Sequence, residues 1–157
     1  MALNAELSTA LWLPSHIYAD LAEAQETMDF LISCYNEPGH PSRGPYVLAV
    51  EARDSGELLG HVGFSPLDDE VEVSYAIAEC ARGRGLGSEA LDHACCWVGL
   101  AFQLTHVIAI TSDQNAASRR LLEKARFHFE RSEPMRFQGT EQQVVRYVRN
   151  LSPQSVA

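Results

Sequence analysis

The sequence predicts an α/β (α+β) fold in which a mixed, mostly antiparallel sheet is flanked by helices. Two short runs of strand-forming residues are joined by a five-residue turn, which predicts an antiparallel hairpin. Further along, two segments with apolar residues at helical spacing are each followed by another β-rich run. Antiparallel hairpins followed by a strand-helix-strand crossover give a mixed sheet with helices on its faces.

The first half of the chain predicts one helix and three strands. Residues 20–35 carry apolar side chains at helical spacing, and the Pro- and Gly-rich residues 36–45 predict a loop. Residues 11–13 form an apolar run stopped by a proline, which fits a short strand. Three strands are expected at residues 46–52, 58–64 and 70–78, with residues 53–57 as the hairpin turn.

The second half predicts two helices and three more strands. A long helix at residues 85–103 has its apolar side chains on one face, and a shorter amphipathic helix is expected at residues 115–125. Strands are expected at residues 105–111, 127–137 and 142–151. The predicted order is therefore helix, three strands, helix, strand, helix and two strands.

The length and composition are those of a single globular domain. The chain has 157 residues, of which 46% are apolar and 21% charged, enough apolar surface for one core of ordinary size. No run approaches the roughly 18 apolar residues that span a bilayer. No basic residue precedes an apolar run within the first 13 residues. We therefore expect one domain over residues 1–157, neither secreted nor bound to a membrane, in the cytoplasm.

The charge of the chain is divided unevenly between its two halves. The net charge is −9, but residues 1–81 hold 2 basic and 14 acidic residues, whereas residues 82–157 hold 10 basic and 7 acidic residues. An acidic protein is a poor nonspecific ligand for nucleic acid or an anionic membrane, so neither is an expected partner. A local basic cluster that begins at Arg82 and Arg84 can still hold a small phosphorylated ligand.

The cysteines and histidines predict neither a disulfide framework nor a metal site. No CxxC pair occurs among the four cysteines, and His93 with Cys96 lacks a second ligand pair at zinc-site spacing. A GxSxG motif is missing, and Cys95 lies inside the long helix rather than at its N-terminus, where a thiolate would be stabilised. We therefore expect no metal and no covalent catalysis by a protein nucleophile.

A glycine-rich run lies between the third predicted strand and the long helix. Its sequence is Arg82-Gly83-Arg84-Gly85-Leu86-Gly87. Such glycines let backbone N–H groups approach a ligand, and the start of the helix adds unpaired N–H donors, so a phosphate or pyrophosphate is the natural guest. The alternative is a tight turn with solvated arginines. Ser88 stands where a dinucleotide fingerprint needs Gly, and the P-loop ending is missing, which disfavours both of those motifs.

This loop resembles the acetyl-coenzyme A loop of the GNAT superfamily of N-acetyltransferases, whose pattern is Q/R-x-x-G-x-G/A. It matches at Arg82, Gly85 and Gly87. Residues 115–127, NAASRRLLEKARF, are similar to the family's N-x-x-S-x-x-x-x-x-K-x-G-F segment at the expected spacing. The resemblance covers residues 46–150 and leans toward the branch that includes ribosomal-protein N-terminal acetyltransferases. It implies a single GNAT-like acetyltransferase domain that uses acetyl-coenzyme A as cosubstrate.

The resemblance also implies which residues bind that cosubstrate. Backbone N–H groups of the loop would hold the pyrophosphate, and the backbone of Ile77 and Ala78 would pair with the pantetheine arm and supply an oxyanion donor. Asn115 would bond the pantetheine amides, and Ser118 would face the sulfur. From the residues alone, Asn115 is a helix N-cap and Ser118 a first-turn polar residue, which is compatible with those roles. The candidate loop residues are Arg82, Gly83, Arg84, Gly85, Leu86, Gly87 and Ser88.

The sequence departs from the family pattern at two positions. Leu122 stands where many members have a tyrosine that protonates the departing thiolate, so Ser118 or water would have to supply that proton. Arg126 replaces the glycine after the second helix, where a positive φ strains other residues. We therefore expect this helix to end differently from the family pattern.

The general base is expected on the third strand. Strand alternation puts Glu72 on the face opposite to Val71 and Val73. We predict Glu72 as the base; the alternative is a solvent-facing carboxylate. Deprotonating a lysine-like amine at pH 7 costs roughly 4.6 kcal/mol, but an α-amino group costs only about 1 to 1.4 kcal/mol. A weak base therefore suits an N-terminal amine better.

The sequence thus predicts an N-acetyltransferase that moves an acetyl group from acetyl-coenzyme A to a primary amine, either a protein N-terminal amine or a small amine. Direct attack through a tetrahedral intermediate is expected, with Glu72 and Ser118 as catalytic residues. The acidic first half favours a cationic acceptor, and a monomer or homodimer is expected. Two alternatives stay open: a catalytically silent GNAT-like module that binds coenzyme A or a partner protein, and a nucleotide-binding regulatory domain.

Overall fold

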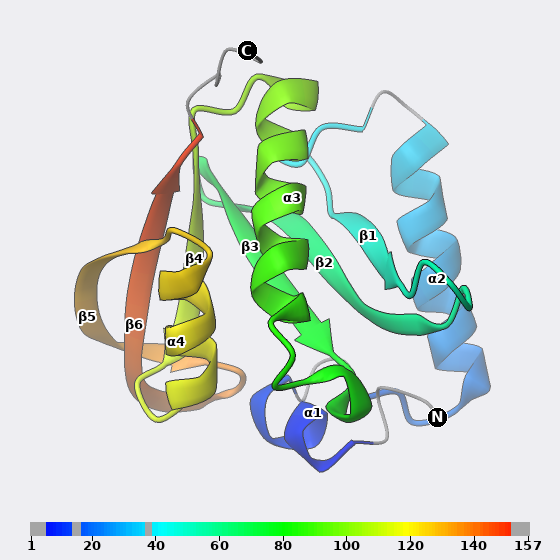
Figure 1. The fold of residues 1–157 in the computed structure, drawn as a ribbon, viewed down its shortest axis with the longest axis horizontal. Helices are drawn as coiled ribbons and strands as arrows, with labels where there is room; N and C mark the ends of the chain where they lie inside the picture. The colour runs from blue at the N-terminus through cyan, green and yellow to red at the C-terminus, as the bar shows by residue number, and fades with distance from the viewer. Residues whose placement is uncertain (1–5, 14–16, 37–38, 152–157) are drawn as a thin grey trace.

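Six strands form one sheet in the order β1-β2-β3-β4-β6-β5 (Figure 1). The structure is a computed structural model that describes residues 6–13, 17–36 and 39–151. Its helices are α1 (Leu7–Trp12), α2 (Leu21–Asn36), α3 (Leu86–Phe102) and α4 (Ala116–Lys124), with a short 3-10 helix η3 (Glu79–Ala81). Its strands are β1 (Tyr46–Glu51), β2 (Leu58–Leu67), β3 (Glu70–Ile77), β4 (His106–Ser112), β5 (His128–Phe137) and β6 (Thr140–Asn150).

The sheet is antiparallel except between its two central strands, β3 and β4. These strands run parallel, and their register holds a single pair, Glu72 with Ile108, near the start of both strands. In the described part of the chain their carboxyl-terminal halves are therefore not paired with each other. This arrangement confirms the predicted mixed, mostly antiparallel sheet and opens the sheet at its centre.

Helices α3 and α4 cover one face of the sheet (Figure 1). The inner side of α3 is fully buried at Leu91, Cys95 and Val98, as its apolar periodicity predicts. These side chains belong to one core cluster that also contains Phe64 of β2 and Tyr147 of β6. Burying an aliphatic or aromatic side chain stabilises a fold by about 1.5–3 kcal/mol, so this layer fixes α3 and α4 on the sheet.

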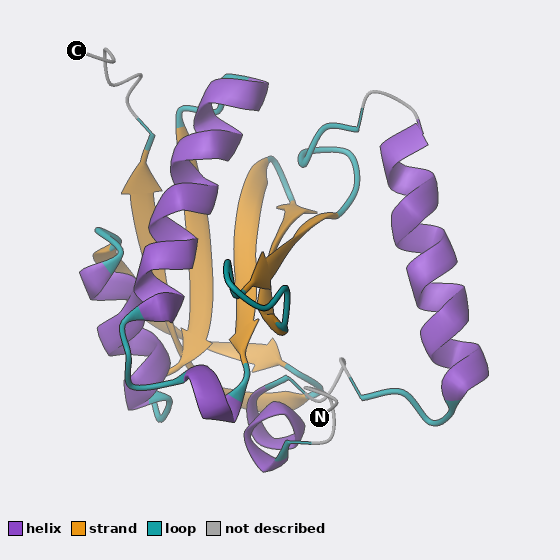
Figure 2. Ribbon diagram, turned by 45° about the vertical axis from the view of Figure 1, so that its right-hand side comes forward, coloured by secondary structure: helices purple, strands orange, loops and turns teal. Residues whose placement is uncertain are grey.

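Helix α2 lies beside β1, at the edge of the sheet, and Figure 2 shows it standing apart from α3. It starts after Asp20, whose carboxylate accepts the Glu23 N–H at 2.9 Å. Near its other end, the Tyr35 hydroxyl accepts the Val47 N–H and donates to the Val47 carbonyl, both at 2.7 Å. The helix therefore satisfies backbone groups that an edge strand would otherwise leave unpaired.

The predicted element order is confirmed from residue 20 onward, but the short strand at residues 11–13 is wrong. Leu11 and Trp12 belong to α1 and Leu13 is its C-cap; the first turn of α1 donates N–H groups to the Glu6 carbonyl. The Glu6 side chain is buried and bound to Arg82 at 2.6 Å, a contact between distant parts of the sequence. A three-residue apolar run is too short to show a period, and it carries no sign of that tertiary contact.

Candidate active site

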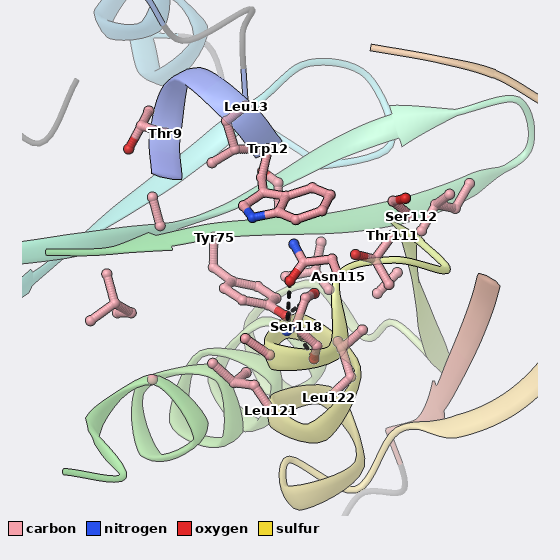
Figure 3. A pocket seen from close by; sticks show the side chains of 18 of the residues that line it. Thr9, Trp12, Leu13, Tyr75, Thr111, Ser112, Asn115, Ser118, Leu121 and Leu122 are labelled. Carbon is pink, nitrogen blue, oxygen red and sulfur yellow. Dashed lines mark hydrogen bonds between the residues drawn. The ribbon is translucent and has the colours of Figure 1, made fainter. Parts of the chain in front are cut away.

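A cavity of about 540 Å³ lies where β3 and β4 separate (Figure 3). Its walls come from α1, β3, the loop after η3, the start of α3, β4, the start of α4 and the β5–β6 turn. Along β3 it is lined from Ile77, close to the glycine-rich loop, to Glu72. At about 3.3 Å per residue, those five steps span about 16 Å. The cavity is thus long enough to connect the loop with the predicted base.

The glycine-rich loop needs glycine for its backbone conformation. Gly83 has φ 74° and Gly85 has φ 83°, both left-handed, and a Cβ at either position would meet no atom within 4 Å. Gly85 is the N-cap of α3, and its carbonyl accepts the Ser88 hydroxyl at 2.9 Å. The first-turn N–H groups of α3 lack intrahelical acceptors, as at any helix start. The predicted anion-binding loop therefore has the required backbone shape.

Gly87 has a different role from the other two loop glycines. A Cβ there would lie 2.7 Å from Leu121 Cδ1 and 3.3 Å from Ile77 Cγ1. Gly87 therefore lets the start of α3 pack closely on α4 and β3. This close approach brings the loop next to the cavity, which Leu86 and Gly87 both line.

Arg82 contacts protein groups rather than standing open to a ligand. Its Nε donates to the Ile77 carbonyl at 2.7 Å, and a terminal nitrogen pairs with the Glu6 carboxylate at 2.6 Å. Glu6 also accepts the Glu79 N–H at 2.8 Å. Arg82 thus holds α1 against the loop, and Glu6 neutralises part of its charge. Arg84, in contrast, is exposed on the loop.

The predicted pairing of Ala78 with pantetheine needs a correction. The Ala78 N–H donates to the Leu59 carbonyl at 2.8 Å, so this amide is used inside the sheet. Because backbone groups of a strand alternate between its two edges, Tyr75 and Ile77 present theirs toward the gap beside β4. The Ile77 carbonyl already accepts from Arg82. The strand edge at Tyr75 and the N–H of Ile77 are therefore the groups placed for a ligand.

The start of α4 brings two predicted residues into the cavity. The Asn115 side-chain oxygen accepts the Ser118 N–H at 3.0 Å, so the predicted N-cap is confirmed. The Ser118 hydroxyl lies 2.7 Å from the hydroxyl of Tyr75 on β3 (Figure 3). Sequence analysis missed Tyr75 as a site residue. Its position on the core-facing side of β3, opposite α4, follows from strand alternation and could have indicated it.

The two departures from the family pattern have different outcomes. Leu122 is 1% exposed and belongs to the core cluster, so α4 provides an apolar side chain where a tyrosine was expected. Arg126 has φ 64°, the left-handed conformation that glycine would adopt. The expectation that this helix ends differently is therefore wrong, and a non-glycine residue occupies the strained position.

Two glutamates on the same side of β3 differ in their surroundings. Glu72 lines the cavity, and burial raises its pKa, opposed by a hydrogen bond to the Ile110 backbone and by the charge of Arg146. Burial also acts on Glu70, but contacts with Arg146 at 2.5 Å and His106 at 3.2 Å outweigh it and lower its pKa. Glu72 is therefore the carboxylate of the pair that is better suited to accept a proton in the cavity.

The described residues contain no group of three or more His, Cys, Asp or Glu side chains that could hold a metal ion. Among the same residues, no helix has both the length and the apolar character needed to cross a membrane.

Parallel strands that separate beside a glycine-rich helix start are the arrangement that the sequence motifs predict. The chain belongs to the GNAT acetyltransferase family, because the family model of the acetyltransferase (GNAT) domain matches residues 2–128. It is an acyltransferase enzyme. No curated protein sequence matches the chain.

Solved structures of other acetyltransferases share the fold at low sequence identity. Spermidine N-acetyltransferase from Vibrio cholerae, in complex with CoA and spermine, has a TM-score of 0.78 at 19% identity, covering 96% of this chain and 86% of that chain. Ribosomal-protein-S5-alanine acetyltransferase from Vibrio fischeri has a TM-score of 0.76 at 15% identity, covering 95% and 83%. A GNAT-family acetyltransferase from Bacillus anthracis has a TM-score of 0.75 at 14% identity, covering 94% and 84%.

Proposed function

We propose that this enzyme transfers the acetyl group of acetyl-coenzyme A to a primary amine, which attacks the thioester directly. The observation that carries the proposal is the cavity between β3 and β4, which connects the glycine-rich loop to Glu72 and is lined by Ser118 between them. The cosubstrate would enter from the loop and the amine from the side of Glu72. The thioester would then meet the amine beside Ser118.

The loop and the start of α3 would hold the pyrophosphate of the cosubstrate. Gly83 and Gly85 give the backbone its shape, and the first-turn N–H groups of α3 offer donors to an anion. Exposed Arg84 adds positive charge, whereas Arg82 supports the loop through Glu6. The Asn115 oxygen caps α4, which leaves its NH₂ group to bond a pantetheine amide.

The centre of the cavity would stabilise the tetrahedral intermediate. An N–H on the open edge of β3, at Tyr75 or Ile77, would donate to the oxyanion as the amine attacks. Glu72 would take the proton that the attacking nitrogen loses. Its raised pKa makes it a stronger base than an ordinary carboxylate, although still a weak one for a lysine-like amine.

A protein N-terminal amine, or a small amine of similar pKa, is the acceptor that this weak base favours. The structural neighbours named above act on ribosomal-protein S5 alanine and on spermidine, which supports an amine as the acceptor. The excess of acidic residues in the first half of the chain supports a cationic acceptor.

The test measures the consumption of acetyl-coenzyme A with a panel of amines. The free thiol that the reaction releases is detected to obtain the rate. The panel contains peptides with a free N-terminus, peptides with a blocked N-terminus and one lysine, and spermidine. We expect peptides with a free N-terminus to turn over at least about tenfold faster than the lysine peptides, from the difference in deprotonation cost. Preferred turnover of the lysine peptides would contradict the assignment of the acceptor.

The second candidate, a catalytically silent module, is disfavoured by the match to the acetyltransferase family, although the buried Leu122 in place of the family tyrosine removes one expected proton donor. A protein that binds acetyl-coenzyme A but acetylates no amine of the panel would support this candidate. The third hypothesis, a nucleotide-binding regulatory domain, requires ATP to compete with acetyl-coenzyme A at the glycine-rich loop. Competition binding with ATP therefore separates it from the other two.

A further inference from the structure

Two hydroxyl groups from distant parts of the sequence meet inside the cavity. The Tyr75 hydroxyl on β3 lies 2.7 Å from the Ser118 hydroxyl in the first turn of α4, and it also donates to the Ser118 carbonyl at the longer distance of 3.3 Å (Figure 3). Both side chains line the cavity. The backbone of Ser118 is fixed as well, because Asn115 accepts its N–H. Ser118 is therefore held both through its side chain and through its backbone.

In this contact either hydroxyl can donate, and the orientation with Tyr75 as donor has a consequence for Ser118. A serine hydroxyl has one hydrogen to donate and can accept from other donors. When Tyr75 donates to the Ser118 oxygen, the serine hydrogen is available to a third group in the cavity. Leu122, one turn further along α4, has no polar atom that could donate in its place.

We propose that Tyr75 is a positioning residue that directs the Ser118 hydroxyl hydrogen toward the sulfur of bound coenzyme A. The proposal rests on the proposed function, since it assumes that the thioester lies beside Ser118. In the step, the amine nitrogen forms a bond to the carbonyl carbon and the carbon–sulfur bond breaks. The electron pair leaves on sulfur, where Ser118 donates a hydrogen bond to the thiolate. The proton lost by the amine passes to Glu72 and solvent, and a proton from solvent finally neutralises the thiolate.

The surroundings of Tyr75 keep its hydroxyl protonated. Burial raises the pKa of Tyr75 to about 12, although its hydrogen bond with Ser118 opposes this shift. The phenol therefore keeps its hydrogen throughout the pH range in which acetyl transfer would be measured. A hydrogen bond to an ionised acceptor is roughly twice as strong as one between neutral groups, and a chain of two donors polarises it further. The Tyr75–Ser118 chain thus acts most strongly on the departing thiolate.

The first test titrates the thiol of bound coenzyme A with pH. The ultraviolet absorbance of the thiolate is measured relative to that of the protein alone. The wild type should lower the pKa of the bound thiol below that of free coenzyme A, and Tyr75→Phe should raise it again by about one pH unit. Tyr147→Phe is the matched control, because Tyr147 is also a buried tyrosine, with its hydroxyl 3.2 Å from Glu123 and outside the cavity. An unchanged thiol pKa in Tyr75→Phe would overturn the proposal.

The second test separates positioning from a structural role by kinetics. Tyr75→Phe should lower kcat about tenfold and leave KM for acetyl-coenzyme A within about twofold. Because Tyr75 acts through Ser118, the double variant with Ser118→Ala should be no slower than Ser118→Ala alone. Effects that multiply in the double variant would overturn the proposal.

The two proposals fail in different ways. A wild type that binds coenzyme A with a lowered thiol pKa, but acetylates no amine, contradicts only the proposed function. Normal turnover that Tyr75→Phe leaves unchanged contradicts only the role of Tyr75. A folded wild type that does not bind coenzyme A overturns both.

Discussion

Glu70 and Glu72 lie two positions apart on β3, and their environments shift their pKa values in opposite directions. Glu70 pairs with Arg146 and contacts His106, so it is held ionised in a partly buried cluster. Glu72 faces the cavity, where burial raises its pKa. Strand alternation predicts that both side chains lie on the same face of β3. The groups around each carboxylate then determine whether its pKa is raised or lowered.

At Glu72, activity and stability should change in opposite directions. Burial raises its pKa, so the folded protein binds this proton more tightly than the unfolded chain. The stabilisation from that proton is complete below the ordinary pKa of the carboxyl and is lost as pH rises through the raised value. At pH 7 Glu72→Gln should therefore raise Tm, while kcat/KM falls about a hundredfold. Thermal melts and kinetics at pH 7 measure both effects, and the gain in Tm should disappear at acid pH.

Glu70→Gln is the matched control for that variant. It removes a carboxylate from the cluster around Arg146, whose side chain is only 8% exposed, so Tm should fall while turnover changes little. Unchanged kcat/KM in Glu72→Gln would contradict its assignment as the base.

Arg126 stores strain at the end of α4. Its φ of 64° is unfavourable for a residue with a Cβ, and its ion pair with Asp92, at 3.7 Å on a largely exposed side chain, offsets little of this. Arg126→Gly should therefore raise the free energy of unfolding by about 1 kcal/mol in urea titrations. Arg126→Ala removes the same ion pair but keeps the strain, so it should give no gain. Equal stability of the two variants would show that the backbone is not strained there.

At the scale of elements, β3 forms one wall of the cavity, and Gly60 of the neighbouring strand β2 lets β3 approach closely. Gly60 lies opposite Ile77, and a Cβ at this position would lie 2.2 Å from the Ala76 carbonyl oxygen. Gly60→Ala should push the end of β3 away and cost about 2–3 kcal/mol of unfolding free energy. At Gly63 on the same strand, the nearest atom is the movable Ser74 hydroxyl at 3.1 Å, so Gly63→Ala should cost under about 1 kcal/mol. Similar costs for both variants in chemical denaturation would contradict this reasoning.

The elements that could be predicted are those whose sequence shows a clear period or turn. The α3 helix and the β1–β2 hairpin have such signals, and both are confirmed. Helix α1 is held by the hydrogen bond between Glu6 and Arg82, which lies 76 positions away. No local sequence pattern could therefore predict this helix. The Tyr75–Ser118 contact was missed for the same reason. Most residues of the candidate site could thus be named from motifs, but Tyr75 could not, and the contacts that position these residues arise only when the sheet assembles.

At the scale of the whole molecule, charge is segregated along the sequence. Residues 1–81 have a net charge of −12, from 2 basic and 14 acidic residues, whereas the remainder is net positive and contains the loop. Such a field would attract a cationic acceptor and weaken with salt. Raising the ionic strength from about 0.01 M to about 1 M shortens the Debye length from about 30 Å to about 3 Å. KM for a cationic peptide should then rise severalfold.

A neutral amine of matched size is the control for this salt series. Its KM should stay within about twofold over the same range, because it feels no long-range attraction. An identical salt response of both acceptors in initial-rate measurements would contradict a role for the acidic half of the chain.

The most direct measurement is a calorimetric titration of the protein with acetyl-coenzyme A, using Gly85→Val and Gly56→Val. Both glycines have a left-handed φ, 83° and 68°, and a Cβ at either would meet no atom within 4 Å, so the backbone strain is matched. Gly56 lies in the turn between β1 and β2, whereas Gly85 starts α3 beside the cavity. We predict saturable binding that Gly56→Val keeps and Gly85→Val loses. A folded wild type that does not bind, or equal binding by both variants, would contradict the assignment of this loop as the cosubstrate site.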